Sequence, residues 1–165
     1  MTAGPLRVAI LTVSDAGSRG EREDTSGDAI ARWAGDRDYH VAARALVPDE
    51  TGEIVRTLVQ WADGGDIDLI LTTGGTGLTS RDVTPEATRA VLDRHAPGIA
   101  EALRMTAYPG LPAAALSRGL AGVRGRTLIV NLPGSPGGVG DGLAVLAGFV
   151  DHAGDLLRDL QRGHP

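Results

Sequence analysis

The segment TTGGTGLTSRDVTPEAT, from Thr72 to Thr88, has the residue types and spacing of an anion-binding turn. Glycine has no Cβ atom, so it takes positive φ angles easily and lets backbone N–H groups come close to a ligand. Four residues of this turn offer such groups: Gly74, Gly75, Thr76 and Gly77. The pattern indicates a phosphate site with open space in front of the glycines. A tight turn without a ligand explains the same residues equally well.

Two carboxylates follow different predicted strands, Asp49 in the sequence VPDE and Asp82 just beyond the glycine-rich turn. Mg²⁺ binds one or two carboxylates together with phosphate oxygens and water, so this pair suits a magnesium site. The alternative is that Asp49 and Asp82 only cap the helices expected to begin near Thr51 and Thr84.

A second loop of interest, NLPGSPGG, ends another apolar run. Its bend consists of Pro133, Gly134, Ser135 and Pro136. The prolines restrict the bend, and Ser135 offers a hydroxyl or a backbone amide. A restricted loop loses less entropy when it binds a ligand. An ordinary turn is the alternative here.

The sequence lacks the residues that several other kinds of functional site require. The chain has no cysteine, which excludes disulfides, thiolate metal sites and cysteine nucleophiles. Its four histidines are not spaced three or four residues apart, which argues against a histidine zinc site. The GxSxG, GxxxxGK[ST] and GxGxxG patterns of serine hydrolases, P-loop NTPases and Rossmann dehydrogenases are also absent at the expected places.

The elements that must position these residues alternate along the chain. Apolar runs rich in β-branched residues predict strands at Leu6–Val13, His40–Val47, Asp68–Thr73 and Arg126–Leu132. Helical patterns occur at 49–65, 84–98, 98–108, 113–123 and 139–163, with Thr84 expected as the N-cap of the second. This alternation predicts an α/β sheet covered by helices. Because ligands in such folds bind beyond the carboxyl ends of the strands, the loops there are expected to meet.

The length and the net charge of the chain limit its number of domains and its kinds of partner. At 165 residues the chain is expected to form a single domain over 1–165. The net charge of −5 and the absence of a basic cluster argue against nucleic acid or an anionic membrane as a partner. The apolar stretch near the N-terminus is too short for a signal peptide or a membrane span, so we expect a cytoplasmic protein.

Taken together, the motifs resemble the Mog/MoaB family of molybdenum-cofactor biosynthesis proteins, relatives of the gephyrin G domain. The resemblance runs from Leu6 to Val150 and is carried, in order, by LILTTGGTG, SRDVTPEAT, PGIAEALR, ALSRG and TLIVNLPGSP. It implies a three-layer α/β/α sandwich with a mostly parallel central sheet, assembled as a homotrimer or a hexamer. It also implies an adenylyltransferase of this pathway, which uses Mg²⁺ and ATP to join AMP to the terminal phosphate of molybdopterin and releases pyrophosphate.

The resemblance assigns roles to particular residues. Asp49 and Asp82 match the family's aspartates for nucleotide and metal chemistry. The expected binding residues then also include Ser14, Asp15, Thr73 and Arg81. Many relatives carry a lysine soon after the second loop's proline, where this chain has Gly137–Val139, so a cation is absent there. The intact pair Arg81-Asp82 favours the catalytically active class.

Other interpretations stay open from the sequence. One is a non-catalytic protein that binds or carries molybdopterin, and another is a general nucleotide-binding scaffold. The segment SDAGSRGERED, from Ser14 to Asp24, is also ambiguous. Arg19 and Arg22 can reach phosphates from it, or the segment is simply a solvated charged loop.

Overall fold

The computed structural model describes residues 4–159. Its strands are β1 (Arg7–Val13), β2 (His40–Val47), β3 (Leu69–Thr73), β4 (Arg94–His95), β5 (Ala121–Arg124) and β6 (Thr127–Leu132). Its helices are α1 (Asp15–Ser18), α2 (Thr25–Asp36), α3 (Thr51–Asp63), α4 (Thr84–Val91), α5 (Pro97–Ala107), the 3-10 helix η1 (Pro112–Leu116), α6 (Pro136–Leu146) and α7 (Val150–Leu157). The four predicted strands and the helix predicted after the second of them are confirmed.

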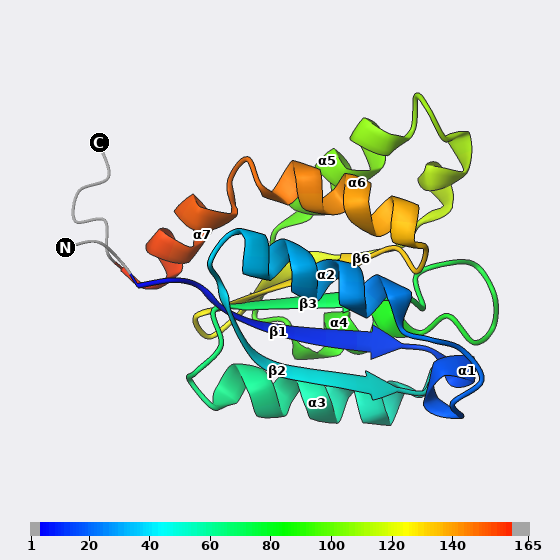
Figure 1. Ribbon diagram of the computed structural model, residues 1–165, viewed down its shortest axis with the longest axis horizontal. Coiled ribbons are helices and arrows are strands. Elements are labelled where there is room, and N and C mark those ends of the chain that lie inside the picture. Colours follow the sequence, from blue (N-terminus) through cyan, green and yellow to red (C-terminus); the bar gives the residue numbers. More distant parts are fainter. Residues whose placement is uncertain (1–3, 160–165) are drawn as a thin grey trace.

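The strands form one sheet in the order β2-β1-β3-β6-β5-β4. β1, β2, β3 and β6 run parallel, whereas β5 runs antiparallel to both of its neighbours. The strand order reverses between β1 and β3, which is where ligands bind in open α/β sheets. The carboxyl ends of the parallel strands and the loops that follow them gather at one end of the molecule, on the right in Figure 1.

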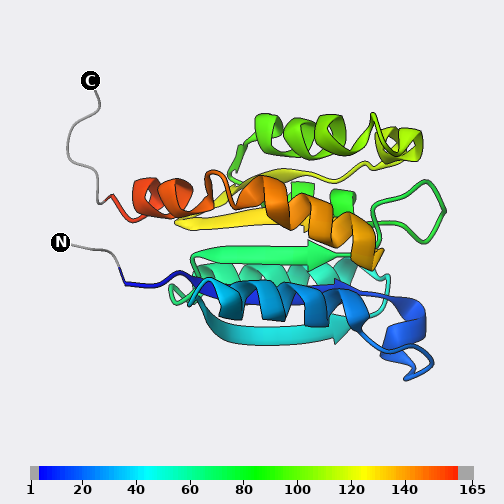
Figure 2. The same cartoon turned by 45° about the horizontal axis from the view of Figure 1, so that its top comes forward.

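Helices cover both faces of the sheet (Figure 2). Along β1, Val8 and Ile10 belong to a core shared with α2, α6 and α7, whereas Ala9 and Leu11 belong to a core shared with α3 and α4. This alternation is the period of two that a β-strand imposes on its side chains. The expected three-layer α/β/α sandwich with a mostly parallel sheet is therefore confirmed.

The prediction of a helix at 113–123 is wrong beyond its first turn. Only η1 forms there, and the chain then extends into β5. The buried side chain of Asn131 accepts a hydrogen bond from the N–H of Leu120 at 3.0 Å, and the N–H of Asn131 donates to the carbonyl of Leu120. Arg104 donates to the carbonyls of Ser117 and Gly119. These tertiary hydrogen bonds outweigh the helical propensity of the alanines, which is only a weak preference.

Two other predicted helices differ at their ends. The one predicted at 84–98 stops at Val91, because Arg94 and His95 pair with β5 and Pro97 begins α5. The helix predicted at 139–163 is two helices, α6 and α7, with a break at 147–149, and its part from Leu160 onward lies outside the described residues. No helix between residues 4 and 159 is long and apolar enough to span a membrane.

Candidate active site

A cleft of about 800 Å³ opens beyond the carboxyl ends of β1, β2, β3 and β6. All four loops that the sequence singled out reach it. Its lining consists of Thr12, Val13, Ser14, Gly17, Arg22, Glu23, Asp24, Thr25, Ser26, Leu46, Asp49, Thr73, Gly74, Gly75, Asp82, Gly134, Ser135 and Pro136. The fold thus brings residues more than 100 positions apart in the sequence to one concave surface at the switch point of the sheet.

The glycine-rich turn needs glycine at two successive positions. Gly74 and Gly75 have φ angles of +94° and +70°, which side chains disfavour. A Cβ atom on Gly74 would lie 2.2 Å from the carbonyl oxygen of Val13. A Cβ atom on Gly75 would lie 2.2 Å from Oγ1 of Thr84 and 3.1 Å from Oδ1 of Asp49. The space expected in front of Gly75 for a phosphate is therefore partly occupied by the protein itself.

Thr84 secures this turn and does not cap α4, so the predicted N-cap is wrong. Its hydroxyl donates to the carbonyl of Gly74 at 3.0 Å, and its N–H donates to the carbonyl of Gly75 at 3.1 Å. Val83 occupies the N-cap position of α4 without a side-chain hydrogen bond. The start of α4 is thus used to hold the turn in its left-handed conformation.

We expect Gly75→Ala to lower the free energy of unfolding by about 2 kcal/mol. The positive φ angle costs an alanine about 1 kcal/mol, and Thr84 must turn away and lose a hydrogen bond of about 1 kcal/mol. Urea denaturation would measure the loss. Gly137→Ala is the matched control, because a Cβ atom there meets nothing within 4 Å. Equal stability of the two variants would contradict this account of the turn.

Asp49 is held by a reciprocal pair of hydrogen bonds with Asp15. The N–H of Asp15 donates to Oδ2 of Asp49 at 2.9 Å, and the N–H of Asp49 donates to Oδ1 of Asp15 at 3.0 Å. Burial raises the pKa of the Asp49 carboxyl above its ordinary value; the hydrogen bond from the Asp15 N–H opposes this rise, and the nearby carboxylates of Asp15 and Asp82 add to it. A nearby cation would relieve this electrostatic cost.

Arg81 binds two residues next to Asp49: Asp15, which is hydrogen-bonded to Asp49, and Glu50, which follows it in the chain. Its guanidinium donates to both carboxylate oxygens of Asp15, at 2.9 and 3.0 Å, and to Glu50 at 2.8 Å. These hydrogen bonds hold the pKa of Asp15 below its ordinary value. Arg81 is thereby fixed as part of the scaffold around Asp49, and neither it nor Asp15 lines the cleft.

Asp82 closes a turn and lines the cleft. Its Oδ2 accepts hydrogen bonds from the N–H and the hydroxyl of Thr79, at 2.9 and 2.8 Å. Arg118 stabilises the same segment, because its guanidinium donates hydrogen bonds to the carbonyls of Gly77 and Asp82 at 2.8 and 2.7 Å. The Asp82 side chain therefore has a fixed position beside the glycine-rich turn.

The capping alternative is wrong for both carboxylates. The N-caps of α3 and α4 are Glu50 and Val83, and neither makes a side-chain capping hydrogen bond. Asp49 and Asp82 instead flank the turn: a Cβ atom on Gly77 would lie 2.9 Å from Oδ2 of Asp82, as one on Gly75 would lie beside Asp49.

This donor set fits a hard divalent cation that is shared with a substrate. Asp49 and Asp82 supply carboxylate oxygens from two strand ends, which is the ligand type Mg²⁺ prefers. Across residues 4–159 no group of three or more acidic, histidine or cysteine side chains is arranged to hold a metal ion alone. The remaining ligands would have to be phosphate oxygens and water, as is usual for magnesium with nucleotides.

The second loop is held by hydrogen bonds from β3 and from α2. The hydroxyl of Thr73 donates to the carbonyl of Pro133 at 2.6 Å, and the hydroxyl of Ser26 donates to the carbonyl of Gly134 at 2.8 Å. Ser135 is the N-cap of α6 and accepts a hydrogen bond from the N–H of Gly138. The bend is therefore the entry of a helix, whose positive N-terminal end faces the cleft.

Comparisons with known proteins agree with this architecture. The family model described as "Probable molybdopterin binding domain" matches residues 9–152. The chain belongs to the Mog/MoaB family. The resemblance inferred from the motifs is thus confirmed.

Individual relatives of this Mog/MoaB chain cover nearly its whole length. The molybdopterin adenylyltransferase of Helicobacter pylori is 37% identical over 92% of this chain and 88% of its own. The molybdopterin biosynthesis enzyme MoaB of Thermus thermophilus is 54% identical, with a TM-score of 0.88 over 93% of this chain and 97% of its own. The molybdopterin biosynthesis Mog protein of Mycobacterium ulcerans is 45% identical, with a TM-score of 0.87 over 92% of this chain and 99% of its own.

Some expected binding residues of this Mog/MoaB chain lie elsewhere. Thr76, Gly77 and Pro133 line a second, apolar pocket of about 250 Å³, formed mainly by α5, η1 and α6. Ser135 lines both this pocket and the cleft. The two cavities therefore adjoin at Ser135.

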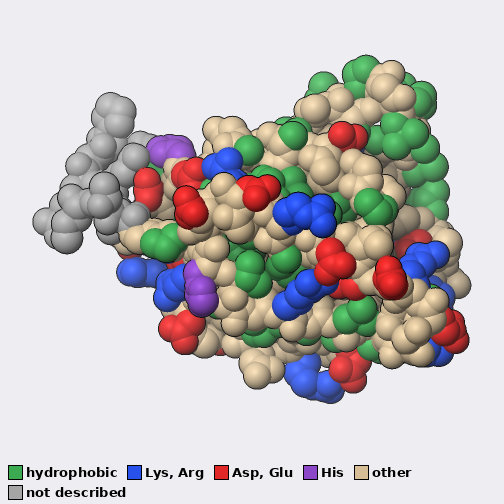
Figure 3. Space-filling model, in the orientation of Figure 1, with side chains coloured by type: hydrophobic (Ala, Val, Ile, Leu, Met, Phe, Trp, Pro, Cys, Tyr) green, Lys and Arg blue, Asp and Glu red, His purple; other side chains and the backbone are tan. Residues whose placement is uncertain are grey.

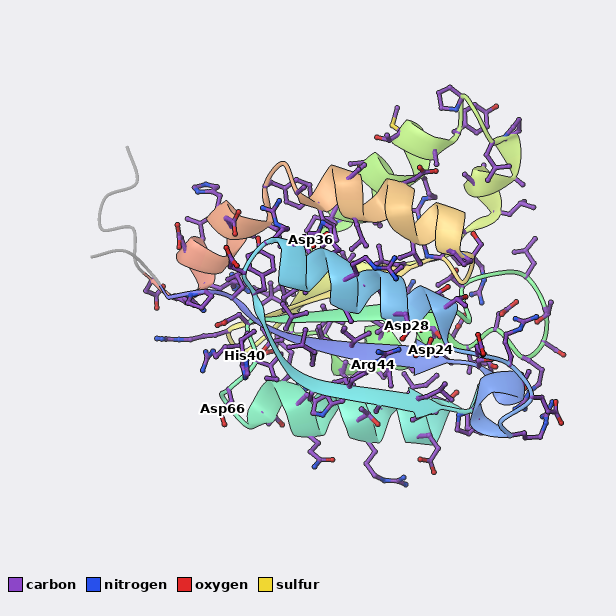
Figure 4. All side chains as sticks on the ribbon, viewed as in Figure 1. Asp24, Asp28, Asp36, His40, Arg44 and Asp66 are labelled. Atoms are coloured by element: carbon purple, nitrogen blue, oxygen red, sulfur yellow. The ribbon has the colours of Figure 1, made fainter. Side chains whose placement is uncertain are left out.

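The sequence analysis missed Asp24, which organises the wall of the cleft. Asp24 is the N-cap of α2 and accepts hydrogen bonds from the N–H of Gly27 and the hydroxyl of Thr12. Arg44 of β2 reaches toward Asp24 and Asp28, as Figure 4 shows, and donates to them at 3.0 and 2.6 Å. An aspartate just before a helical stretch is a recognisable N-cap signal that could have indicated this role.

Proposed function

We propose that this chain is a molybdopterin adenylyltransferase that uses Mg²⁺ and ATP. The observation that carries the proposal is the position of Asp49 and Asp82 on either side of the glycine-rich turn, in a cleft at the switch point of the sheet. The name of the Helicobacter pylori relative, which matches almost the whole chain, supports the same reaction.

The reaction needs positioning and charge neutralisation, not a covalent nucleophile. A phosphate oxygen of molybdopterin forms a bond to the α-phosphorus of ATP while the bond to pyrophosphate breaks. A magnesium ion held by Asp49 and Asp82 would offset the charge on the phosphates and on the leaving pyrophosphate. The glycine-rich turn brings the backbone close to Asp49 at Gly75 and to Asp82 at Gly77, and the N-terminal end of α6 adds a favourable dipole.

Pyrophosphate release on incubation with molybdopterin, ATP and Mg²⁺ tests this function. We expect pyrophosphate and adenylylated molybdopterin in equal amounts, and neither when molybdopterin or Mg²⁺ is left out. Binding of molybdopterin without pyrophosphate release would instead indicate a non-catalytic carrier. ATP binding that ignores molybdopterin would indicate a general nucleotide-binding scaffold.

The proposal extends to a single cytoplasmic domain that assembles as a homotrimer. Large apolar side chains are exposed on and around α5 and η1, in the upper right of Figure 3. They are Met105, Tyr108, Leu111 and Leu116. Exposed apolar patches of this kind commonly mark protein contacts, so this surface supports contact with a second copy of the chain.

We expect Met105→Glu to convert the trimer to monomer at micromolar concentration. The side chain of Met105 is 74% exposed, so the substitution leaves the fold of the monomer intact while placing a charge in an apolar contact. Sedimentation velocity would measure the change. Gln60→Glu, on the opposite face in α3, is the control and should leave the trimer unchanged. A wild-type chain that sediments as a monomer would contradict the proposed assembly.

A further inference from the structure

The cleft carries many acidic side chains and little basic charge. Glu23, Asp24, Asp49 and Asp82 line it, whereas Arg22 is the one basic side chain among its lining residues. Arginine is well suited to phosphate, because its planar guanidinium donates several hydrogen bonds to phosphate oxygens. A phosphate in this cleft therefore has one side-chain cation available from the wall.

The neighbouring arginines already have partners. Arg81 and Arg44 are held by the ion pairs described above. Arg19 donates to both carboxylate oxygens of Glu21 at 3.0 Å. Arg118 is bound to the segment that carries Asp82. Moving Arg81, Arg44 or Arg118 to a ligand would break hydrogen bonds to the segments around the cleft, and moving Arg19 would break its exposed pair with Glu21.

Arg22 differs from these residues. Within residues 4–159 its side chain is exposed and takes part in no hydrogen bond or ion pair. It lies shortly before Thr25 and Ser26, which begin α2 and line the same wall. The chain contains no lysine, so a permanently charged side-chain donor for a phosphate must be an arginine. Arg22 can supply that charge from this wall.

We propose that Arg22 binds phosphate oxygens of a substrate in this cleft. The proposal rests on the function proposed above and adds a residue for charge neutralisation on the wall of the cleft that precedes α2. Asp49 and Asp82 would hold the divalent ion, and Arg22 would contact phosphate oxygens that the ion leaves free.

Calorimetric titration of the full chain with Mg-ATP, and separately with molybdopterin, tests the proposal. We expect Arg22→Gln to raise the Kd for at least one of these ligands about tenfold, as loss of a charge-assisted hydrogen bond predicts. Arg22→Lys should recover part of the affinity, because it restores the charge but not the planar fork. Arg19→Gln, in the same segment but already paired with Glu21, is the control and should leave both Kd values within about twofold.

The ligand whose Kd changes identifies the source of the phosphate. Unchanged affinity of Arg22→Gln for both ligands would overturn the proposal, and so would an equal loss in Arg19→Gln, which would indicate only the general charge of the loop. The binding measurement is independent of turnover. If wild-type chain binds Mg-ATP without releasing pyrophosphate in the presence of molybdopterin, the proposed reaction fails while the role of Arg22 is still decided.

Discussion

Asp82→Asn is expected to lower adenylyl transfer at least about 100-fold while the fold stays intact. A bound divalent ion contributes several kcal/mol of charge stabilisation, and asparagine removes the negative charge that binds the ion. Its amide oxygen can still accept both hydrogen bonds from Thr79, so the turn is preserved. Pyrophosphate release and the thermal midpoint, measured on the same preparation, would show inactivity without loss of stability.

Related variants sharpen this test. Asp49→Asn should behave like Asp82→Asn, and the double variant should be little worse than either, because groups that hold one ion act as a unit. Asp66→Asn is the control, since this side chain is 90% exposed and lies at the opposite end of the sheet (Figure 4). Full activity in Asp82→Asn would refute the proposed mechanism, whatever its stability.

Asp68→Asn is expected to lower the free energy of unfolding by about 3 kcal/mol at pH 7. Asp68 is buried at the amino end of β3 and binds both Arg7 of β1 and Arg158, which follows α7. Arg158 also donates to the carbonyls of Gly4 and Pro5. The substitution leaves two guanidinium groups without their shared carboxylate, and the thermal midpoint should fall by about 6–12 °C.

The effect of Asp68→Asn should also depend on pH. Burial alone would raise the pKa of Asp68, but hydrogen bonds from Arg7 and Arg158 hold it well below its ordinary value. Because the pKa is lower in the folded state, the stabilisation is complete above the unfolded value of about 4 and is lost progressively as pH falls from there through the lower folded value. The difference between wild type and variant should therefore be largest at pH 7 and begin to converge at pH 3.

Urea denaturation at pH 7, 5 and 3 measures this convergence. Asp159→Asn is a suitable control, because the pair of Asp159 with Arg126 is exposed and contributes less than about 1 kcal/mol. A constant difference between Asp68→Asn and wild type at all three pH values would show that charge at Asp68 does not account for its effect.

The sequence by itself determined the parallel core of the fold and the four loops that approach the site. The runs at β1, β3 and β6 are apolar on both faces, which requires a sheet covered on both sides by helices. Once these strands are parallel, their carboxyl ends share one edge of the sheet. Gly74-Gly75, Asp49 and Asp82 were therefore predictable as neighbours without knowledge of the distances between them.

Only the tertiary structure decided what each loop residue contacts. Thr84 has the residue type of an N-cap, yet the approach of β1 to the glycine-rich turn makes it the anchor of that turn. The alanines at 113–115 favour a helix, yet the hydrogen bond from the Leu120 N–H to Asn131 and the one from Arg104 to Ser117 hold the following residues in an extended path. Local propensities of a few tenths of a kcal/mol per residue cannot resist contacts of this kind.

Arg81 and Arg22 also show the difference between what the sequence predicts and what the tertiary structure decides. In the sequence both are arginines in polar loops that follow predicted strands, and only the motif around Arg81 indicated a binding role. The fold places Asp15 and Glu50 within 3.0 Å of Arg81, whereas Arg22 faces the cleft without such partners. Which cation is available to a ligand depends on the positions of carboxylates from distant segments, and only the folded chain sets those positions.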